Sequence, residues 1–165
     1  MIEPDIRLVE PSTPAQWDAL RALLREYAGG LGVDLSYQDF EGELAALPGA
    51  YAPPGGLALL AMVDGAPAGC VAMRPRPDLA ASHPRACEMK RLYARPRHRG
   101  LGLGRRLAEA LVARAGELGY RILLLDTLPD MHAAQALYAG LGFQPVPPYY
   151  PSPVAGTLFL RRALP

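Results

Sequence analysis

The stretch that decides the fold of this chain is ACEMKRLYARPRHRGLGLGRRLA, residues 86–108. Its first nine residues, 86–94, predict a β-strand, and three glycines then alternate at positions 100, 102 and 104. Apolar side chains recur at helical spacing after these glycines and predict a long amphipathic helix that ends at Gly119: Leu103, Leu107, Ala110, Leu111 and Leu118. A strand, a glycine-rich loop and a helix therefore follow one another here.

The glycine-rich loop has the features of an anion-binding site. Glycine lets backbone amides approach a ligand closely, and a helix N-terminus adds unpaired amides and a partial positive charge. Positions 89–108 contain no acidic residue and carry seven cations: Lys90, Arg91, Arg95, Arg97, Arg99, Arg105 and Arg106. A pyrophosphate fits such a loop better than a carboxylate. The alternative interpretation is a solvated basic turn that binds nothing.

Two common phosphate-binding loops do not match this pattern. A Walker loop ends in Gly-Lys-Ser/Thr, whereas Gly104 is followed by Arg105 and Arg106. A dinucleotide-binding Rossmann loop needs Gly-x-Gly-x-x-Gly, and its third glycine is absent. Asp126 does end the following strand, where a ribose-binding acid would sit. The Rossmann interpretation is therefore weakened but stays open.

The segments before residue 86 predict three strands and two helices. Thr13 and Gln16 match a capping box with Pro14 at the first helical position, and Gly29 and Gly30 end that helix. Asp64-Gly65 is a hairpin signal between two of the strands. The expected elements are strand 5–10, the helix from residue 13, a weaker helix over about 36–47, and strands 57–63 and 68–74.

The segments after the long helix predict a buried strand over 121–126, a short helix over about 130–140, an extended piece from Phe143, a proline-rich stretch 145–153 and a last strand over about 156–162. The order is strand, two helices, three strands, helix, strand, helix, two strands. This order predicts an α/β (α+β) fold with a mixed sheet and helices on both faces. A chain of 165 residues is expected to form one domain, 1–165.

Arg99-Gly100-Leu101-Gly102-Leu103-Gly104 resembles the Arg/Gln-x-x-Gly-x-Gly/Ala signature of the GNAT superfamily of N-acetyltransferases. Upstream, residues 88–93 resemble the strand that leads into that loop. Downstream, Ala134-x-x-Leu137-Tyr138-x-x-Leu141-Gly142-Phe143 resembles the second motif of the family. The resemblance implies a mostly antiparallel sheet of about seven strands flanked by about four helices.

The resemblance also implies a role for each part of the loop. Acetyl-CoA is the implied co-substrate, and the backbone of Leu92, Tyr93 and Ala94 pairs with its pantetheine arm. Its pyrophosphate is held by the amides of Arg99, Gly100, Leu101, Gly102, Leu103, Gly104 and Arg105. A main-chain amide near Leu92 or Tyr93 polarises the acyl carbonyl. Family members often carry Asn at the position of Met131, so that contact is missing here or replaced by His132.

Tyr138 and Glu88 are the candidate acid and base. Tyr138 matches the family tyrosine that protonates the leaving thiolate, although an aromatic residue on a short helix also commonly fills a core. Glu88 lies where some family members place their base, and a structural ion pair with Lys90 or an arginine is an equal alternative. His132 and His98 are weaker base candidates.

The acceptor side is less well marked. Residues 147–153 either line the acceptor pocket or form a rigid connector, and residues 29–37 and 51–56 are candidates for its other side. The expected acceptor is a primary amine of a small molecule or of an amino-acid-like compound. A non-catalytic acyl-CoA-binding sensor or interaction module is the alternative function, and a homodimer is an open alternative for the assembly.

The composition argues against other classes of partner. The net charge of +1 favours neither nucleic acid nor a membrane surface. Cys70 and Cys87 lie in apolar strand-like runs and are expected to be buried free thiols, and no cysteine or histidine spacing suggests a metal site. The N-terminus shows no signal-peptide pattern, so a cytoplasmic protein is expected.

Overall fold

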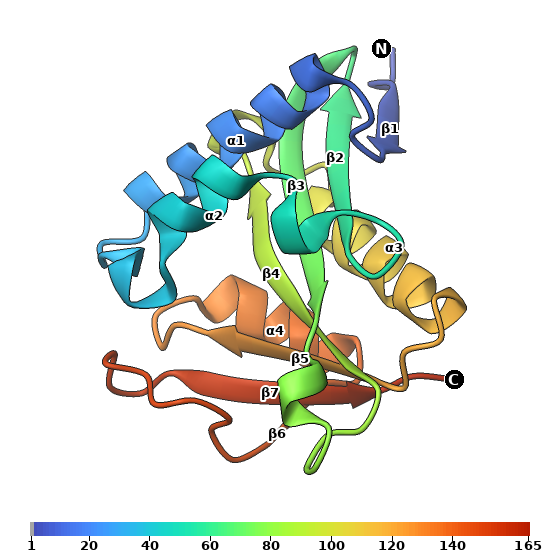
Figure 1. Cartoon of the computed structure of the whole chain (residues 1–165). Coiled ribbons are helices and arrows are strands. Elements are labelled where there is room, and N and C mark those ends of the chain that lie inside the picture. Colours follow the sequence, from blue (N-terminus) through green and yellow to red (C-terminus); the bar gives the residue numbers. More distant parts are fainter. Residues whose placement is uncertain (1) are drawn as a thin grey trace.

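The computed structural model describes residues 2–165, and its centre is a seven-stranded sheet with the strand order β1-β2-β3-β4-β5-β7-β6. Every neighbouring pair is antiparallel except β4 and β5, which are parallel (Figure 1). The strands are β1 Ile6–Val9, β2 Leu57–Val63, β3 Ala66–Pro75, β4 Ala86–Ala94, β5 Ile122–Thr127, β6 Gln144–Pro145 and β7 Leu158–Ala163. The predicted mixed, mostly antiparallel sheet is confirmed.

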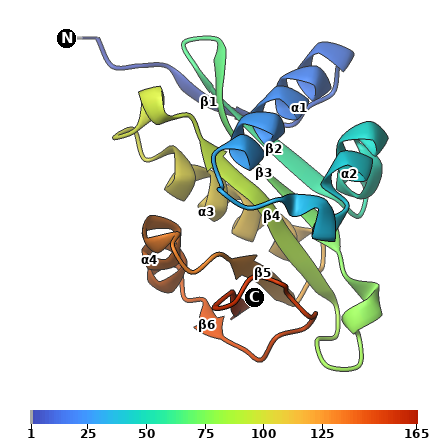
Figure 2. The same ribbon diagram turned by 90° about the vertical axis from the view of Figure 1, so that its left-hand side faces the viewer.

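Four α-helices cover the two faces of this sheet: α1 Pro14–Gly29, α2 Phe40–Ala46, α3 Leu103–Glu117 and α4 His132–Gly140. Helices α1 and α2 lie on one face, and α3 and α4 lie on the other (Figure 2). Each face has its own buried cluster, one between α1, α2 and the sheet and a larger one beneath α3 and α4. The predicted placement of helices on both faces is confirmed.

Local sequence signals explain where the first elements begin and end. The Thr13 side chain accepts a hydrogen bond from the Gln16 amide, and the Gln16 side chain reaches back to the Thr13 amide, so the predicted capping box is present. Leu20, Leu23 and Leu24 are completely buried on the inner face of α1. The β2–β3 hairpin turns through Asp64 and Gly65, whose φ angles of 50° and 81° suit this dipeptide.

The weaker helix predicted over about 36–47 is divided in the structure. Residues Leu35–Gln38 form a 3₁₀ turn (η1), and α2 begins only at Phe40. Asp39 lies between them with φ of 52°, a left-handed conformation that interrupts a helix. This interruption directs Tyr37 and Gln38 toward the sheet, where both line the cleft described below.

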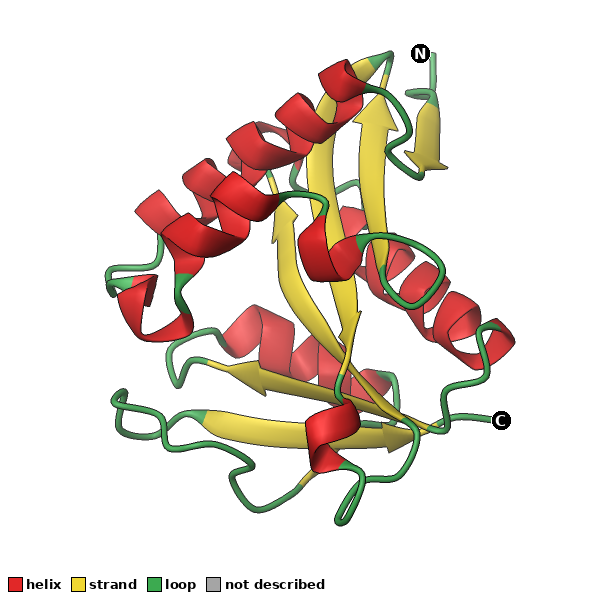
Figure 3. Cartoon of the chain, viewed as in Figure 1, coloured by secondary structure: helices red, strands yellow, loops and turns green. Residues whose placement is uncertain are grey.

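The second half of the chain extends the sheet beyond β4. Strand β5 is buried on both faces from Ile122 to Leu125, as its continuous apolar run predicts. The connection over residues 146–157 joins β6 to β7 as a loop (Figure 3). With one parallel pair among the described strands, the sheet lacks the successive parallel units of a Rossmann fold.

Both cysteines are buried free thiols, as expected from the sequence. Burial raises the pKa of Cys70 and of Cys87 to about 12, so both remain protonated at neutral pH. Among residues 2–165, no helix is long and apolar enough to cross a membrane.

Candidate active site

Strands β4 and β5 pair over a short length and then separate. Their register runs from Ala86 opposite Ile122 to Glu88 opposite Leu124, and no later residue of β4 pairs with β5 in the described chain. Figure 1 shows the two strands diverging from this point. A cleft opens at the separation and draws its lining from both strands and from α1, η1 and α4: Tyr27, Leu31, Leu35, Tyr37, Gln38, Met89, Lys90, Arg91, Leu92, Asp126, Thr127, Leu128, Met131 and Tyr138.

A β-bulge in β4 faces this cleft. Cys70 of β3 is opposite Tyr93 and Ala72 is opposite Lys90, so β4 contains one more residue than β3 between these pairs. Arg91 lies in the bulge with φ of 65°, a conformation that needs support from its surroundings.

The guanidinium of Arg91 supplies that support. It donates two 3.0 Å hydrogen bonds to the Glu43 carboxylate of α2 and lies 5.2 Å from the centre of the Phe40 ring. Both side chains of the ion pair are largely buried, with exposed fractions of 3% for Arg91 and 16% for Glu43. Helix α2 therefore fixes the bulge that shapes the cleft.

The glycine-rich loop adopts the open conformation that its sequence indicates. Gly100 and Gly102 have φ angles of 86° and 69°, and a Cβ at either position would meet no atom within 4 Å. Gly102 is the N-cap of α3 and makes no side-chain hydrogen bond. The first amide of α3 that donates an intrahelical hydrogen bond is that of Arg106, to Gly102 O at 3.0 Å. The earlier amides of α3 are thus free of intrahelical partners.

The seven cations near the loop do not act as one group. Arg91 is engaged with Glu43, Lys90 lies 3.5 Å from Asp126, and Arg95 pairs with Glu26 of α1. Arg105 pairs with Glu109 on the surface of α3. Three of the cations thus tie β4 and its following loop to other elements, whereas Arg99 and Arg105 are exposed beside the free amides.

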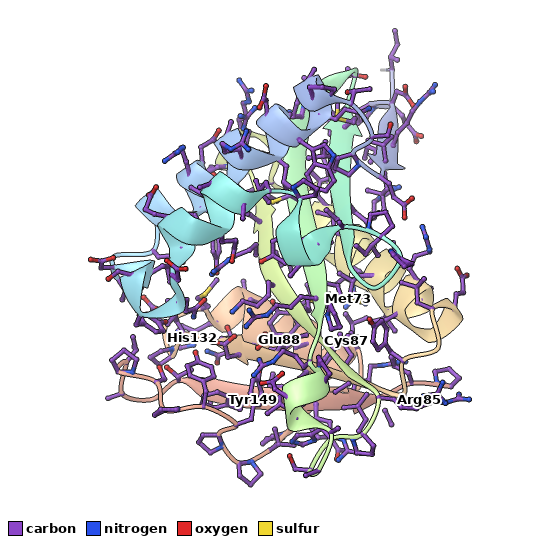
Figure 4. The ribbon with its side chains drawn as sticks, in the orientation of Figure 1. Met73, Arg85, Cys87, Glu88, His132 and Tyr149 are labelled. Atoms are coloured by element: carbon purple, nitrogen blue, oxygen red, sulfur yellow. The ribbon has the colours of Figure 1, made fainter. Side chains whose placement is uncertain are left out.

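Glu88 is completely buried at the last position of β4 that pairs with β5. Its Oε1 accepts hydrogen bonds from Arg74 Nε at 2.8 Å and Arg76 Nη1 at 2.9 Å, and its Oε2 accepts one from the Tyr149 hydroxyl at 2.6 Å. Figure 4 labels Glu88 and Tyr149. Burial alone would raise the pKa of Glu88, but the charges of Lys90 and Arg74 outweigh it and hold the pKa below its ordinary value. Glu88 is not part of the cleft lining.

Tyr138 is a buried residue of α4 that lines the cleft. Its ring makes an edge contact with Phe143, with centroids 5.7 Å apart, so the packing role considered from the sequence is present. Burial raises the pKa of Tyr138 above its ordinary value, which keeps the hydroxyl protonated. Within residues 2–165, the Tyr138 hydroxyl has no hydrogen-bond partner.

Several polar residues of the cleft were not identified from the sequence as site residues. The sequence suggests only a ribose-binding role for Asp126 and no role for Gln38 or Thr127. Thr127 is 4% exposed, and its hydroxyl has no partner among the described residues. Tyr150 approaches from the proline-rich connection and donates to Asp126. Asp126 at the end of a buried apolar strand and Tyr150 in the proline-rich stretch 147–153 carry a sequence signal, whereas Gln38 and Thr127 carry none.

The two histidines considered as bases lie away from these groups. His132 is the first residue of α4 and is exposed, and His98 lies in the short 3₁₀ turn before the glycine loop. Neither histidine is part of the cleft lining.

Comparison with known proteins now decides the family. The sequence model of the Acetyltransferase (GNAT) family matches residues 17–143. The chain belongs to the GNAT family of acetyltransferases. It is 37% identical to an uncharacterized N-acetyltransferase of Schizosaccharomyces pombe over 163 residues, covering 98% of this chain and 97% of that protein.

Solved structures agree with this GNAT fold. A GNAT-family acetyltransferase of Staphylococcus aureus Mu50 superposes with a TM-score of 0.77 at 18% identity, over 98% of this chain and 100% of that one. The yncA protein of Salmonella typhimurium, solved with its cofactor acetyl-CoA, gives a TM-score of 0.69 at 18% identity over 97% and 94% of the two chains. The family match and the 37% identity to an N-acetyltransferase make this chain an acyltransferase with acetyl-CoA as co-substrate, which argues against the non-catalytic alternative.

The residues present fit such a co-substrate. The free amides at the start of α3 suit a pyrophosphate. The β5-facing edge of β4 beyond Glu88 has no strand partner in the described chain and suits an extended arm with amide groups. The unpartnered hydroxyl of buried Thr127 adds a polar group in the cleft.

Proposed function

We propose that this GNAT acetyltransferase transfers the acetyl group of acetyl-CoA to a primary amine of a small molecule or of an amino-acid-like acceptor. The observation that carries the proposal is the cleft at the separation of β4 and β5, because it exposes an unpaired strand edge beside Tyr138 and polar side chains. The side of the cleft formed by the free edge of β4 suits an acyl donor, and the side formed by α1 and η1 suits an acceptor.

The donor is held by backbone groups. Leu92, Tyr93 and Ala94 offer the free edge of β4 to the pantetheine amides, in the manner of an added strand. The amides of residues 99–105 hold the pyrophosphate at the start of α3, with the exposed side chains of Arg99 and Arg105 beside it. The Thr127 hydroxyl is a further donor or acceptor on the opposite wall and supplies polarity that Met131 lacks.

The β4 bulge positions the group that polarises the acyl carbonyl. A main-chain amide near Leu92 or Tyr93 is released from sheet pairing because the register shifts here. An amide held in a fixed direction stabilises the oxyanion that develops as the amine attacks. The Arg91–Glu43 ion pair keeps the direction of this amide constant.

Tyr138 donates a hydrogen bond to the leaving thiolate and then protonates it. Its hydroxyl stays protonated because burial raises its pKa, and it has no competing partner within residues 2–165. A hydrogen bond from this hydroxyl to the sulfur lowers the energy of the departing thiolate before the proton moves. Its contact with Phe143 holds the ring in place.

Of the two roles considered for Glu88, its contacts support the ion pair. Three donors occupy its two oxygens, and its lowered pKa makes the carboxylate a weaker proton acceptor. In this role Glu88 holds the side chains of Arg74, Arg76 and Tyr149 together. The proline-rich connection thus contributes tyrosines to this region as well as rigidity.

A panel of small primary amines tests the proposal. The purified protein is mixed with acetyl-CoA and each amine in turn. Free thiol is measured with a colorimetric thiol reagent, and the acetylated amine is identified by mass spectrometry. At least one amine is expected to raise thiol release well above acetyl-CoA alone and to appear as its N-acetyl product. Thiol release that never depends on the amine would contradict transfer to a small amine.

A further inference from the structure

Asp126 and Lys90 lie where β4 and β5 part. The last paired residues are Glu88 and Leu124, and Lys90 and Asp126 are the next residues on the same face of each strand. Lys90 Nζ and Asp126 Oδ1 are 3.5 Å apart, and the exposed fractions of the two side chains are 6% and 10%. This ion pair therefore spans the narrow end of the cleft.

A closed ring of side chains holds Asp126. The Tyr150 hydroxyl donates to Asp126 Oδ2 at 2.5 Å, Gln38 Nε2 lies 3.5 Å from the Tyr150 hydroxyl, and Lys90 Nζ donates to Gln38 Oε1 at 3.0 Å. The four residues come from β5, the 146–157 connection, η1 and β4. Four separate elements therefore fix the direction of one carboxylate.

The carboxylate of Asp126 keeps room for a ligand. A carboxylate offers about four acceptor positions, and Asp126 uses one for Tyr150 and one toward Lys90. Asp126 lines the cleft and retains access to it, whereas Glu88 is 0% exposed and accepts from three donors. The two acids differ in the access that a proton acceptor needs.

We propose that Asp126 binds the ammonium group of a primary alkylamine acceptor and takes its proton. This role rests on the proposed function, and it deepens that function by naming the acceptor class and the base. Lys90, Gln38 and Tyr150 are positioning residues, since each acts through Asp126. The Tyr27 and Tyr37 rings and Leu35 line the same cleft as Asp126 and are the groups that would contact the carbon skeleton of the acceptor.

The transfer balances with these groups. Asp126 accepts one proton from the ammonium, and the freed nitrogen lone pair attacks the acyl carbon. As the C–N bond forms, the C–S bond breaks, its electron pair stays on sulfur, and Tyr138 protonates the thiolate. The amide nitrogen then loses its second proton, which restores the Tyr138 hydroxyl through water, and Asp126 releases its proton to solvent.

The titratable groups around Asp126 are one amine and several phenols: Lys90 of β4, Tyr149 and Tyr150 of the connection, Tyr27 of α1 and Tyr138 of α4. The phenols stay neutral at neutral pH, since burial raises the pKa of Tyr27 to about 12 and raises the other three as well. A test that varies the acceptor at constant pH therefore leaves this surrounding charge unchanged.

The test compares Asp126→Asn with wild type on two amines at neutral pH. One is a simple alkylamine, whose ammonium has a pKa of about 10, and the other is an alkoxyamine, which is already neutral in the assay. Asp126→Asn is expected to lower kcat/KM for the alkylamine by about 10²–10⁴-fold. The loss for the alkoxyamine is expected to be far smaller, because no proton must leave before attack.

Three controls make the result specific. Asp130→Asn, at an exposed aspartate four positions along the chain, should change neither rate. Glu88→Gln should lower both rates by the same factor, since an ion pair does not distinguish the amines. Asp126→Glu keeps an acid and should retain the wild-type preference between the amines even where its folding or rate suffers. The affinity of Asp126→Asn for acetyl-CoA should equal that of wild type.

The outcomes separate the two proposals. If wild type acetylates neither these two amines nor any other amine of the panel, the proposed function fails and the base assignment fails with it. If wild type acetylates both, the base assignment is overturned when Asp126→Asn loses equal activity on the two amines or retains full activity. It is also overturned if Asp126→Glu loses the preference between amines.

Discussion

The glycine-rich loop offers a substitution whose effect is worked out from backbone geometry. Gly102 has φ of 69° and ψ of 26° at the N-cap of α3. A methyl group there meets no atom within 4 Å, so Gly102→Ala changes conformational preference and causes no clash. Alanine in the left-handed region costs about 1–2 kcal/mol relative to its preferred conformations.

This conformational cost of alanine at position 102 is expected to weaken the binding of acetyl-CoA. Gly102 is exposed, so the substituted loop relaxes in the free protein, and acetyl-CoA must then restore the left-handed conformation. A cost of about 1–2 kcal/mol corresponds to an increase in Kd of about 5- to 30-fold. Isothermal titration with acetyl-CoA measures this change, and urea unfolding measures how much of the cost remains in the free energy of unfolding.

Gly119→Ala is the matched control at the other end of α3. Gly119 has φ of 92°, and an added Cβ lies 3.6 Å from Arg85 Nη2, an ordinary contact. The backbone cost is comparable, but it should appear in the free energy of unfolding and leave the Kd for acetyl-CoA unchanged. The reasoning is refuted if Gly102→Ala binds acetyl-CoA as tightly as wild type, or if both variants weaken binding equally.

Three further perturbations test other parts of the structure. Tyr138→Phe removes a hydroxyl without a partner in residues 2–165 and keeps the contact with Phe143; kcat should fall about 10²–10⁴-fold with thermal stability nearly unchanged, and full turnover would remove the general-acid role. Glu88→Gln breaks a buried ion pair and should cost about 3–5 kcal/mol of unfolding free energy at neutral pH. Because folding lowers the pKa of Glu88, its stabilisation is present above the ordinary value of 4.5 and is lost as pH falls through the folded pKa. Urea titrations should therefore show the difference from wild type shrinking below about pH 4.5, and a constant difference would contradict the ion-pair role. Cys70 and Cys87 should resist alkylation in the native protein and react in denaturant, since both thiols are buried with pKa raised to about 12; rapid labelling of native protein, read by mass spectrometry, would contradict the packing.

Local signals in the sequence were sufficient for most of the fold. The capping box at Thr13, the Asp64-Gly65 turn and the periodicity of α3 each act over a few residues, so the pattern specifies the element directly. The prediction of one continuous helix over about 36–47 failed at Asp39, because a left-handed aspartate leaves no periodic signature.

The site was harder to predict from the sequence than the fold, because its residues come together from distant parts of the chain. Arg91 and Lys90 looked like part of a basic loop, yet their partners Glu43 and Gln38 lie 48 and 52 residues earlier. Asp126 becomes a cleft residue only through the β4–β5 register, which no local pattern encodes. The resemblance to GNAT motifs located Tyr138 and the loop, since those motifs are contiguous in sequence.

Amide hydrogen exchange with and without acetyl-CoA tests the central claim most directly, namely that the donor lies in the gap between β4 and β5 with its pyrophosphate at the start of α3. The account predicts slower exchange on binding at Leu92, Tyr93 and Ala94 and within residues 99–105, and no change in the β2–β3 hairpin turn at Gly65. Protection confined to other parts of the chain, with these two segments exchanging as in the free protein, would contradict it.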